Sequence, residues 1–336
     1  MNRLNQISTK HAISKFQESL WFEYCKDPNS YNNNVISIID VDKTNSIQEI
    51  LFAANNLISR HALLRSTFHD KDDNGKPTKC YRREYPANYI KNDVRFMMIT
   101  VEDRDNLVKK PFKLEKLYPI RFYFFVDPIK SDYKIYIICH HIVVDTLGNY
   151  NLLLDFHNLL SGKSLPMLNK STFDDFITQH EEWLYSNDYK LKQKFWRDQI
   201  KSTKDIEWPM QLSSVQQTLD NKQSILQYQV FHNNIEELRA LGHKFKVSWF
   251  VAMFSAVWIT LSSFVDLKNA NIWIPFSARS MPVNHDKNAL SKLVGHFANN
   301  MPIHLNIDAF NSISLCSTIQ QIAKLISTAK QNEMYP

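Results

Sequence analysis

The first part of the chain alternates between strand-like and helix-like spacing of its apolar residues. Residues 34–42 (NVISIIDVD) are rich in β-branched side chains, which favours a strand. Ser46 and Glu49 have the spacing of a helix capping box, and apolar residues follow at three- and four-residue steps as far as Ile58. The pattern predicts a strand followed directly by a helix.

Residues 117–127 and 133–141 predict two further strands, joined by the turn sequence PIKSD. Side chains alternate between the two faces of a strand, so His140 and His141 at the end of the second strand point in opposite directions. Two such histidines cannot both bind one metal ion without breaking the strand, and no third ligand has a diagnostic spacing. A metal site is therefore disfavoured here.

The rest of the chain has the periodicity of several helices and two strands. Helices are predicted at residues 148–160, 172–185, 187–200, 234–243 and 248–264, and near 313–332. Strands are predicted at residues 226–231 and 270–276, after the polar segment 214–224. Because the mixed pattern occurs on both sides of that segment, the sequence predicts an α/β architecture of two similar layers.

Composition and charge narrow the class of protein. Hydrophobic residues make up 44% of the 336 residues and charged residues 22%, as in ordinary globular proteins. The formal net charge is +6, but the 40 basic and 34 acidic residues are interspersed, so the sequence lacks the basic stripe of a nucleic-acid-binding protein. The length favours two subdomains with enough buried surface for an internal cavity.

Several sequence features bear on cofactors and on location. The five glycines form no GxGxxG or Walker pattern, so we expect no nucleotide cofactor. The N-terminus lacks the apolar stretch of a secretory signal, and the apolar runs are too short to span a bilayer. The four cysteines include no CxxC pair, which indicates a reducing cytoplasm.

The segment HHIVVD at residues 140–145 carries the strongest candidate chemistry. His141 ends a predicted strand, and Asp145 follows four residues later in the turn that begins a helix. This arrangement can hold a neutral imidazole at the mouth of a cavity, where it accepts a proton near pH 7, while the carboxylate fixes the loop directly or through an arginine. A buried core histidine, or a surface pair without function, would give the same short pattern.

HHIVVD resembles the HHxxxDG core motif of the condensation domains of nonribosomal peptide synthetases, which belong to the chloramphenicol-acetyltransferase-like acyltransferases. Further segments resemble motifs of that family in the expected order, and together they extend over nearly the whole chain. These segments are SKFQESLW (14–21), YN (31–32), RHALLRSTF (60–68), FDDF (173–176), FWR (195–197), PFSAR (275–279) and VGHFANNMP (294–302).

The resemblance implies an α/β fold of two chloramphenicol-acetyltransferase-like subdomains, arranged as a V-shaped pseudo-dimer with a tunnel between the halves. We assign residues 1–185 to the N-terminal subdomain, which carries the HHxxxD motif, and residues 186–336 to the C-terminal subdomain. Residues 330–336 resemble the beginning of the family motif HQDxPFE, so we expect the second subdomain to be incomplete. The first motif lies close to Met1, from which we expect the domain to begin its polypeptide.

The resemblance also implies roles for individual residues. His141 is the expected catalytic residue, and His140 and Asp145 are the other members of the catalytic motif. Arg65, the second arginine of RHALLRSTF, is expected to pair with Asp145 and to brace the catalytic loop. The residues expected along the substrate tunnel are Thr146, Gly148 and Asn299.

Two positions depart from the family motif. Thr146 stands where the motif has glycine, and Gly148 stands where a serine is common. Threonine adds a branched side chain beside the expected catalytic histidine, so we expect an altered substrate preference or a reduced rate.

The implied function is peptide-bond formation in nonribosomal peptide synthesis. A donor acyl thioester and an acceptor aminoacyl thioester arrive on peptidyl or acyl carrier proteins, and the phosphopantetheine arm belongs to those carriers. The chain itself is therefore expected to bind no cofactor. The expected partners are the carrier proteins and the adenylation and carrier domains of a synthetase, without nucleic acid or membrane.

Other members of the same superfamily provide alternatives. An ester-forming or stand-alone acyltransferase would use the same histidine, and a catalytically impaired fragment would bind carriers without turnover. Epimerization domains share the histidine motif, but residues 14–21 and 294–302 follow the condensation pattern. Cyclization is disfavoured because that variant replaces the first histidine, here His140, with aspartate.

Overall fold

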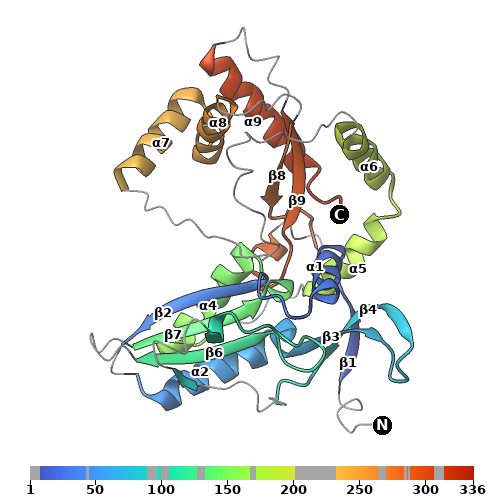
Figure 1. Cartoon of the computed structure of the whole chain (residues 1–336), viewed down its shortest axis with the longest axis vertical. Coiled ribbons are helices and arrows are strands. Elements are labelled where there is room, and N and C mark those ends of the chain that lie inside the picture. The colour runs from blue at the N-terminus through green and yellow to red at the C-terminus, as the bar shows by residue number, and fades with distance from the viewer. Residues whose placement is uncertain are drawn as a thin grey trace, which may run out of the picture. The chain divides into compact units, whose positions relative to one another are not determined.

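A computed structural model of the protein describes residues 8–42, 45–88, 97–99, 106–126, 133–166, 172–200, 232–263, 270–283, 286, 288–305 and 314–336. The chain divides into two compact units (Figure 1). The first contains Met1–Tyr185, Ser277–Asn299 and Pro336, and the second contains Ser186–Phe276 and Asn300–Tyr335. The segment Ser277–Asn299, assigned from the sequence to the second subdomain, belongs by its contacts to the first.

The larger sheet of the first unit has the strand order β2-β7-β6-β5. Its strands are β2 (Asn34–Val41), β7 (Tyr133–His140), β6 (Ile120–Val126) and β5 (Met97–Ile99). The strands β2, β7 and β6 are antiparallel, and β5 pairs with β6 in parallel. In this register His140 lies opposite Asn34 of β2, and the HHIVVD segment leaves the sheet at the C-terminal end of the interior strand β7.

Two helices pack beside this sheet and against each other, α2 (Ile47–Arg60) and α4 (Thr146–Leu160). Ser46 and Glu49 form a complete capping box at the start of α2, as the sequence predicts. The ring of Phe156 on α4 lies 6.0 Å from that of Phe122 on β6, and both residues are fully buried. The core of the first unit thus extends from the sheet to α4, whose first turn follows HHIVVD.

A second sheet of the first unit has the order β1-β4-β3 and is antiparallel. Its strands are β1 (Thr9–Ala12), β4 (Pro77–Glu84) and β3 (Ser66–Lys71). The helices α1 (Lys15–Lys26) and α5 (Phe173–Trp183) meet beside it, with the rings of Phe16 and Phe176 6.2 Å apart. The helix α1 is also joined to the HHIVVD segment, because the Gln17 amide donates a hydrogen bond to the carbonyl of Ile142 at 2.7 Å.

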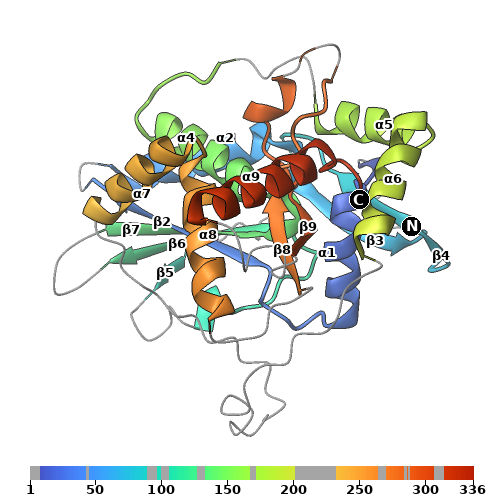
Figure 2. The ribbon, with the colours of Figure 1, turned by 90° about the horizontal axis from the view of Figure 1, so that it is seen from above.

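In the described part of the second unit, four helices pack around the strand pair β8–β9. The helices are α6 (Asn187–Ile200), α7 (His232–Phe245), α8 (Trp249–Ser262) and α9 (Leu315–Gln331), and the strands are β8 (Ala270–Phe276) and β9 (Asn299–Leu305). The helices α8 and α9 contact each other (Figure 2). Trp258 of α8 and Ile322 of α9 are buried in one hydrophobic cluster with Ile303 of β9.

Most predicted elements are confirmed within a few residues. The predicted helix 187–200 is α6 without change, and the strand 270–276 is β8. The predicted strand 133–141 ends one residue early, because His141 begins a short 3-10 helix, His141–Val143. The predicted strand 226–231, the polar segment 214–224 and the turn PIKSD lie outside the described residues.

Among the described residues, no single helix has the length and apolar composition needed to cross a membrane. The bent pair Ile235–Phe245 and Trp249–Ser262, which meet at 98°, satisfies that criterion only when the two are taken together.

Candidate active site

The HHIVVD segment passes from strand to 3-10 helix to α-helix within six residues. The backbone N–H of His141 donates to the carbonyl of Asn33 at 2.8 Å, which fixes the histidine at the end of the β2–β7 ladder. Asp145 is the N-cap of α4, and its Oδ1 accepts a hydrogen bond from the Gly148 N–H at 2.7 Å. These two anchors fix both ends of the turn that carries His141.

His140 lies in the core of the first unit. Its side chain is nearly inaccessible, at 4% exposure, and its ring is perpendicular to those of Tyr24 and Phe112 at 6.3 and 5.8 Å. The Nδ1 atom accepts a hydrogen bond from the Ile142 N–H at 3.1 Å, so His140 caps the 3-10 helix. Burial lowers the pKa of His140 to about 3, with smaller contributions from His141, His296 and Arg121. The residue is neutral at pH 7 and holds the turn in shape.

Asp145 forms a buried ion pair with Arg279. The distance from Nη2 to Oδ1 is 2.8 Å, and both side chains are 4% exposed. The other carboxylate oxygen, Oδ2, accepts a hydrogen bond from the Phe297 N–H at 3.0 Å. Burial lowers the pKa of Arg279, and the Asp145 carboxylate opposes that effect. The carboxylate therefore joins α4 to the segment Ser277–Asn299. Of the two possibilities drawn from the sequence, a loop fixed directly by the carboxylate or through an arginine, the second one includes this contact.

The predicted pair of Arg65 and Asp145 is wrong. Arg65 Nη2 donates to Glu84 Oε1 at 2.6 Å, and its other donors bond the carbonyls of Tyr85 and Ser59, each at 2.9 Å. Arg65 ends the 3-10 helix Ala62–Arg65, immediately before β3, and β4 of that sheet supplies its carboxylate partner. Arg65 therefore braces the smaller sheet. The pairing with Asp145 that was predicted for Arg65 is made instead by Arg279 of the PFSAR segment.

A second histidine, His296, contacts His141. Their Nδ1 atoms are 3.1 Å apart, and the rings are nearly perpendicular at 83°, with 4.9 Å between centroids. His141 is half-buried, whereas His296 is only 6% exposed. Burial first, and then the neighbouring His141, lower the pKa of His296 to about 3. The sequence analysis did not identify this residue, because nothing in the spacing of VGHFANNMP distinguishes it as a partner of His141.

The three residues predicted along a tunnel have different surroundings. Gly148 is buried, and a Cβ atom there would lie 2.6 Å from the carbonyl oxygen of Gly295, so the glycine allows close backbone packing. Thr146 is the first residue of α4 and is exposed. Asn299 is the first residue of β9 and is partly exposed. Gly148 thus packs against the backbone of Gly295, and the tunnel role stays a prediction for all three residues.

The family model of the Condensation domain matches residues 7–336. The chain belongs to the condensation domain family. The resemblance drawn from the sequence motifs is thus confirmed, and family membership implies acyl transfer of the kind used in nonribosomal peptide synthesis.

Similar proteins are multidomain synthetases. The chain is 27% identical to the hybrid PKS-NRPS synthetase TAS1 of Botryobasidium botryosum, with 99% of this chain and 20% of that protein covered. It is 22% identical to tyrocidine synthase 3 of Brevibacillus parabrevis, with 97% and 5% covered. The chain thus spans about a fifth or less of the length of these relatives.

Solved structures confirm the predicted α/β fold. The first condensation domain of the calcium-dependent antibiotic synthetase superposes with a TM-score of 0.78 at 15% identity, covering 98% of this chain and 75% of that one. The epimerization domain from the third module of tyrocidine synthetase B gives a TM-score of 0.79 at 16% identity, with the same two shares covered. Because condensation and epimerization domains share this fold, the fold does not distinguish the two functions. The residues of the site have to do so.

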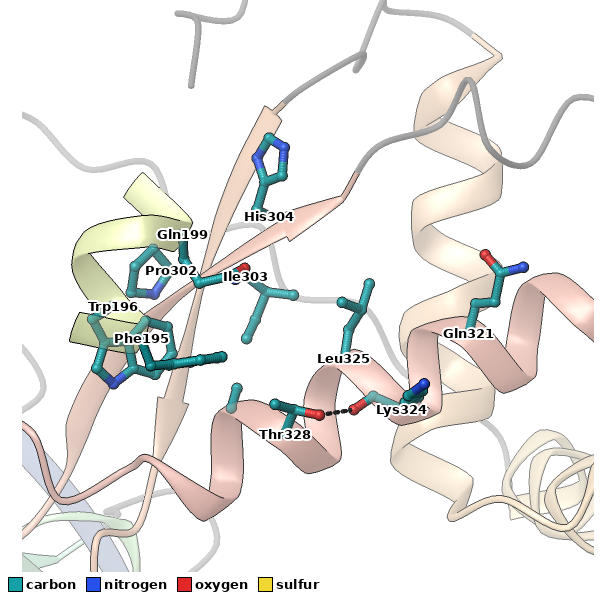
Figure 3. A pocket seen from close by; sticks show the side chains of 11 residues that line it. Phe195, Trp196, Gln199, Pro302, Ile303, His304, Gln321, Lys324, Leu325 and Thr328 are labelled. Carbon is teal, nitrogen blue, oxygen red and sulfur yellow. Dashed lines mark hydrogen bonds between the residues drawn. The ribbon is translucent and has the colours of Figure 1, made fainter. Parts of the chain in front are cut away.

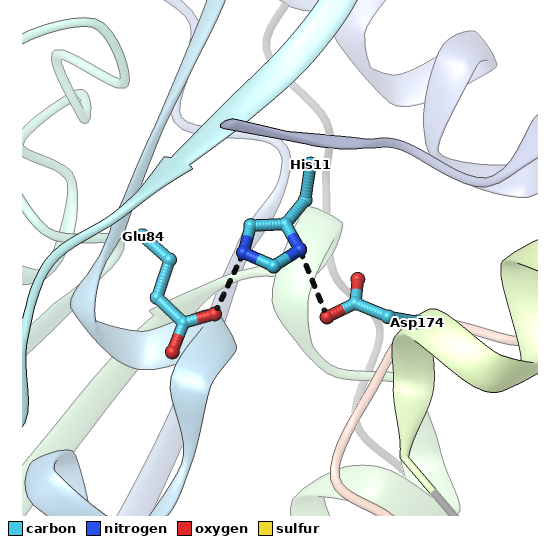
Figure 4. A group of neighbouring side chains, drawn as sticks. All are labelled: His11, Glu84 and Asp174. Atoms are coloured by element: carbon cyan, nitrogen blue, oxygen red, sulfur yellow. Dashed lines mark ion pairs between the residues drawn. The ribbon is translucent and has the colours of Figure 1, made fainter. Parts of the chain in front are cut away.

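Elsewhere in this condensation domain, three titratable side chains place possible metal-ligand atoms close together, but neighbouring arginines already neutralise their negative charge. The imidazole of His11 lies between two carboxylates, with Nε2 3.3 Å from Glu84 and Nδ1 3.2 Å from Asp174 (Figure 4). Arg82 bonds both carboxylates, at 3.1 and 2.6 Å, and Arg65 bonds Glu84. Two guanidinium groups already balance the two carboxylates, so a divalent cation would add excess positive charge. The group fits a salt-bridge cluster that joins β1, β4 and α5.

A separate pocket of about 400 Å³ is lined only by residues of the second unit (Figure 3). Phe195, Ile303 and Leu325 provide an apolar surface, and Lys324 and His304 add polar groups. A smaller pocket of about 290 Å³ lies in the first unit beside the salt-bridge cluster. The HHIVVD residues line neither of these two pockets. The candidate chemistry of the domain therefore rests on the geometry around His141.

Proposed function

We propose that this condensation domain forms an amide bond between a donor acyl thioester and an acceptor aminoacyl thioester, each attached to a carrier protein. One observation carries the proposal. The imidazole of His141 is half-buried at the end of β7, and its Nε2 has no hydrogen-bond partner among the residues that the structure describes. A ring nitrogen of this kind can take a proton from an attacking amine.

In the proposed step, the acceptor nitrogen forms a bond to the carbonyl carbon of the donor, and the bond from that carbon to sulfur breaks. His141 takes the proton that the amine loses and returns it to the departing thiolate, so the protons balance without another reagent. The thiols belong to the phosphopantetheine arms of the carriers, and the chain supplies no cofactor of its own. Adenylation and carrier domains of a synthetase would be the partners that load these arms.

The surroundings of His141 support a rigid catalytic turn. Asp145 is held on both carboxylate oxygens by Arg279 and by backbone N–H groups, so it acts as a support and does not reach the reacting atoms. A positioned general base contributes about 10²–10⁴-fold in rate. Alignment of two tethered substrates contributes up to about 7–11 kcal/mol of the barrier, so positioning supplies more of the proposed catalysis than proton transfer.

A single-turnover assay tests the proposal, using the whole polypeptide in which residues 1–336 occur and carriers loaded with donor and acceptor groups. We expect dipeptidyl product from the wild type and a loss of about 10²-fold or more with His141→Ala. His157→Ala is the matched control, because His157 is exposed on α4 and should leave the rate unchanged.

Three other outcomes would contradict the proposal. Equal product from His141→Ala and wild type would remove His141 from the reaction. Product only with a hydroxyacyl acceptor would indicate an ester-forming enzyme. Carrier binding without product from any loaded pair would indicate a domain that binds carriers but lacks turnover.

A further inference from the structure

We propose that His296 selects the tautomer of His141, so that Nδ1 of His141 carries the proton and Nε2 keeps the lone pair. The inference rests on the proposed function, since it explains how His141 is kept ready to act as a base. His296 would be a positioning residue, because it contacts His141 and not the reacting atoms.

The contact between the two rings requires one donor and one acceptor. The Nδ1 atoms are 3.1 Å apart, which is a hydrogen-bond distance. A neutral imidazole has one N–H group and one lone pair, so two protonated Nδ1 atoms, or two bare ones, would repel each other. His296 is neutral at pH 7, because burial and the neighbouring His141 lower its pKa to about 3. A single proton therefore lies between the two nitrogens.

The proposed role of His141 decides which ring donates that proton. A base at Nε2 needs a lone pair on that atom, and a neutral imidazole has only one N–H group, so the proton of His141 lies on Nδ1. His296 then accepts this proton's hydrogen bond at its own Nδ1, 3.1 Å away, and carries its N–H on Nε2.

The ion pair of Asp145 and Arg279 holds His296 in place from both sides. The carbonyl of Gly295 accepts from the Asp145 N–H at 3.1 Å and from Arg279 Nη2 at 3.3 Å. The N–H of Phe297 donates to Asp145 Oδ2 at 3.0 Å. The residues before and after His296 are thus fixed to the cap of α4. The buried ion pair acts on His141 through His296 as well as through the turn.

Nitrogen NMR of ¹⁵N-histidine-labelled protein reads the tautomer directly and does not depend on activity. The His141 signals are assigned by their loss in His141→Asn. In the wild type we expect Nδ1 of His141 to have the shift of a protonated nitrogen and Nε2 that of a bare one. His296→Leu removes the acceptor, and we expect Nε2 to become protonated. His296→Asn places an amide oxygen near the former Nδ1 and should keep the wild-type pattern.

The same variants are compared in the single-turnover assay with saturating carriers. We expect His296→Leu to slow product formation by at least about tenfold and His296→Asn to restore most of the rate, while carrier affinity stays unchanged in both. A His141 signal with protonated Nε2 in the wild type, or one unaffected by His296→Leu, would overturn the inference. A tautomer change without a change in rate would leave the tautomer assignment intact and overturn the proposed function of His141.

Discussion

Arg279 and Asp145 are 134 residues apart in the sequence, yet their side chains meet at 2.8 Å in the interior of the first unit. The contact connects the cap of α4 to a segment that the chain reaches only after passing through the second unit. Removing one partner of such a pair leaves a buried charge without compensation. The stability of the HHIVVD turn should therefore depend on this pair.

We expect Asp145→Ala to lower the free energy of unfolding by about 3–5 kcal/mol, because Arg279 would remain buried without its carboxylate. Urea unfolding of the variant and the wild type measures the difference. Asp40→Ala is the control, since Asp40 pairs with Lys134 on the surface and should cost no more than about 1 kcal/mol. Similar losses for the two variants would contradict the buried pair.

Double-mutant cycles distinguish the two arginines. We expect the losses from Asp145→Ala and Arg279→Ala to be strongly non-additive, because both remove the same contact. Arg65→Ala removes a contact to Glu84 and should add to Asp145→Ala within about 0.5 kcal/mol. A strong coupling of Arg65 to Asp145 in unfolding experiments would instead favour the pair implied by the family resemblance.

Acid should destabilise the protein through two buried histidines. The pKa values of His140 and His296 are lowered to about 3, so the unfolded state binds these protons below about pH 6.5 while the folded state does not. Stability is thus retained above about pH 6.5 and falls as the pH decreases toward 3. At pH 5 we expect a loss on the order of 2 kcal/mol per histidine.

Urea unfolding at pH 7 and pH 5 measures this effect of acid. His296→Asn replaces one of the two groups with a side chain that does not titrate, so it should reduce the difference between the two pH values. The exposed His157→Asn provides the matched control and should leave the difference as in the wild type. An unchanged pH dependence in His296→Asn would show that His296 is not buried in its neutral form.

Gly148→Ala tests the close approach of two backbone segments. In an open helix this change would be worth up to about 1 kcal/mol in favour of alanine. Here the new Cβ would lie 2.6 Å from the Gly295 carbonyl oxygen, so we expect a net loss of about 1–3 kcal/mol and a reduced rate. Thr146→Ala, at the exposed start of α4, should have little effect on stability. A stabilising Gly148→Ala would show that the segments can move apart.

Local signals in the sequence located the elements of the fold. The capping box of Ser46 and Glu49 depends on residues three positions apart, and it appears at α2 as expected. The alternation of side chains along a strand also predicted that His140 and His141 point in opposite directions. In the structure His140 lies in the core, whereas His141 is half-buried. Periodicity and capping are short-range properties, so one sequence is enough to reveal them.

Contacts between distant segments were harder to predict. RHALLRSTF and PFSAR were both recognised as motifs, but nothing in their spacing shows which arginine meets Asp145. His296 carries no sequence signal, because its contact with His141 depends on a backbone that Asp145 and Arg279 hold in place. Such pairings are set by the tertiary fold and need coordinates.

The segment Ser277–Asn299 leaves the second unit after β8 and returns to it at β9, but its contacts belong to the first unit. A chimera that exchanges only residues 1–185 between relatives would combine one parent's Asp145 and His141 with the other parent's Arg279 and His296. Recombination at a single junction would thus combine the HHIVVD turn of one parent with supporting residues of the other. Functional chimeras should require that residues 277–299 be inherited together with the N-terminal half.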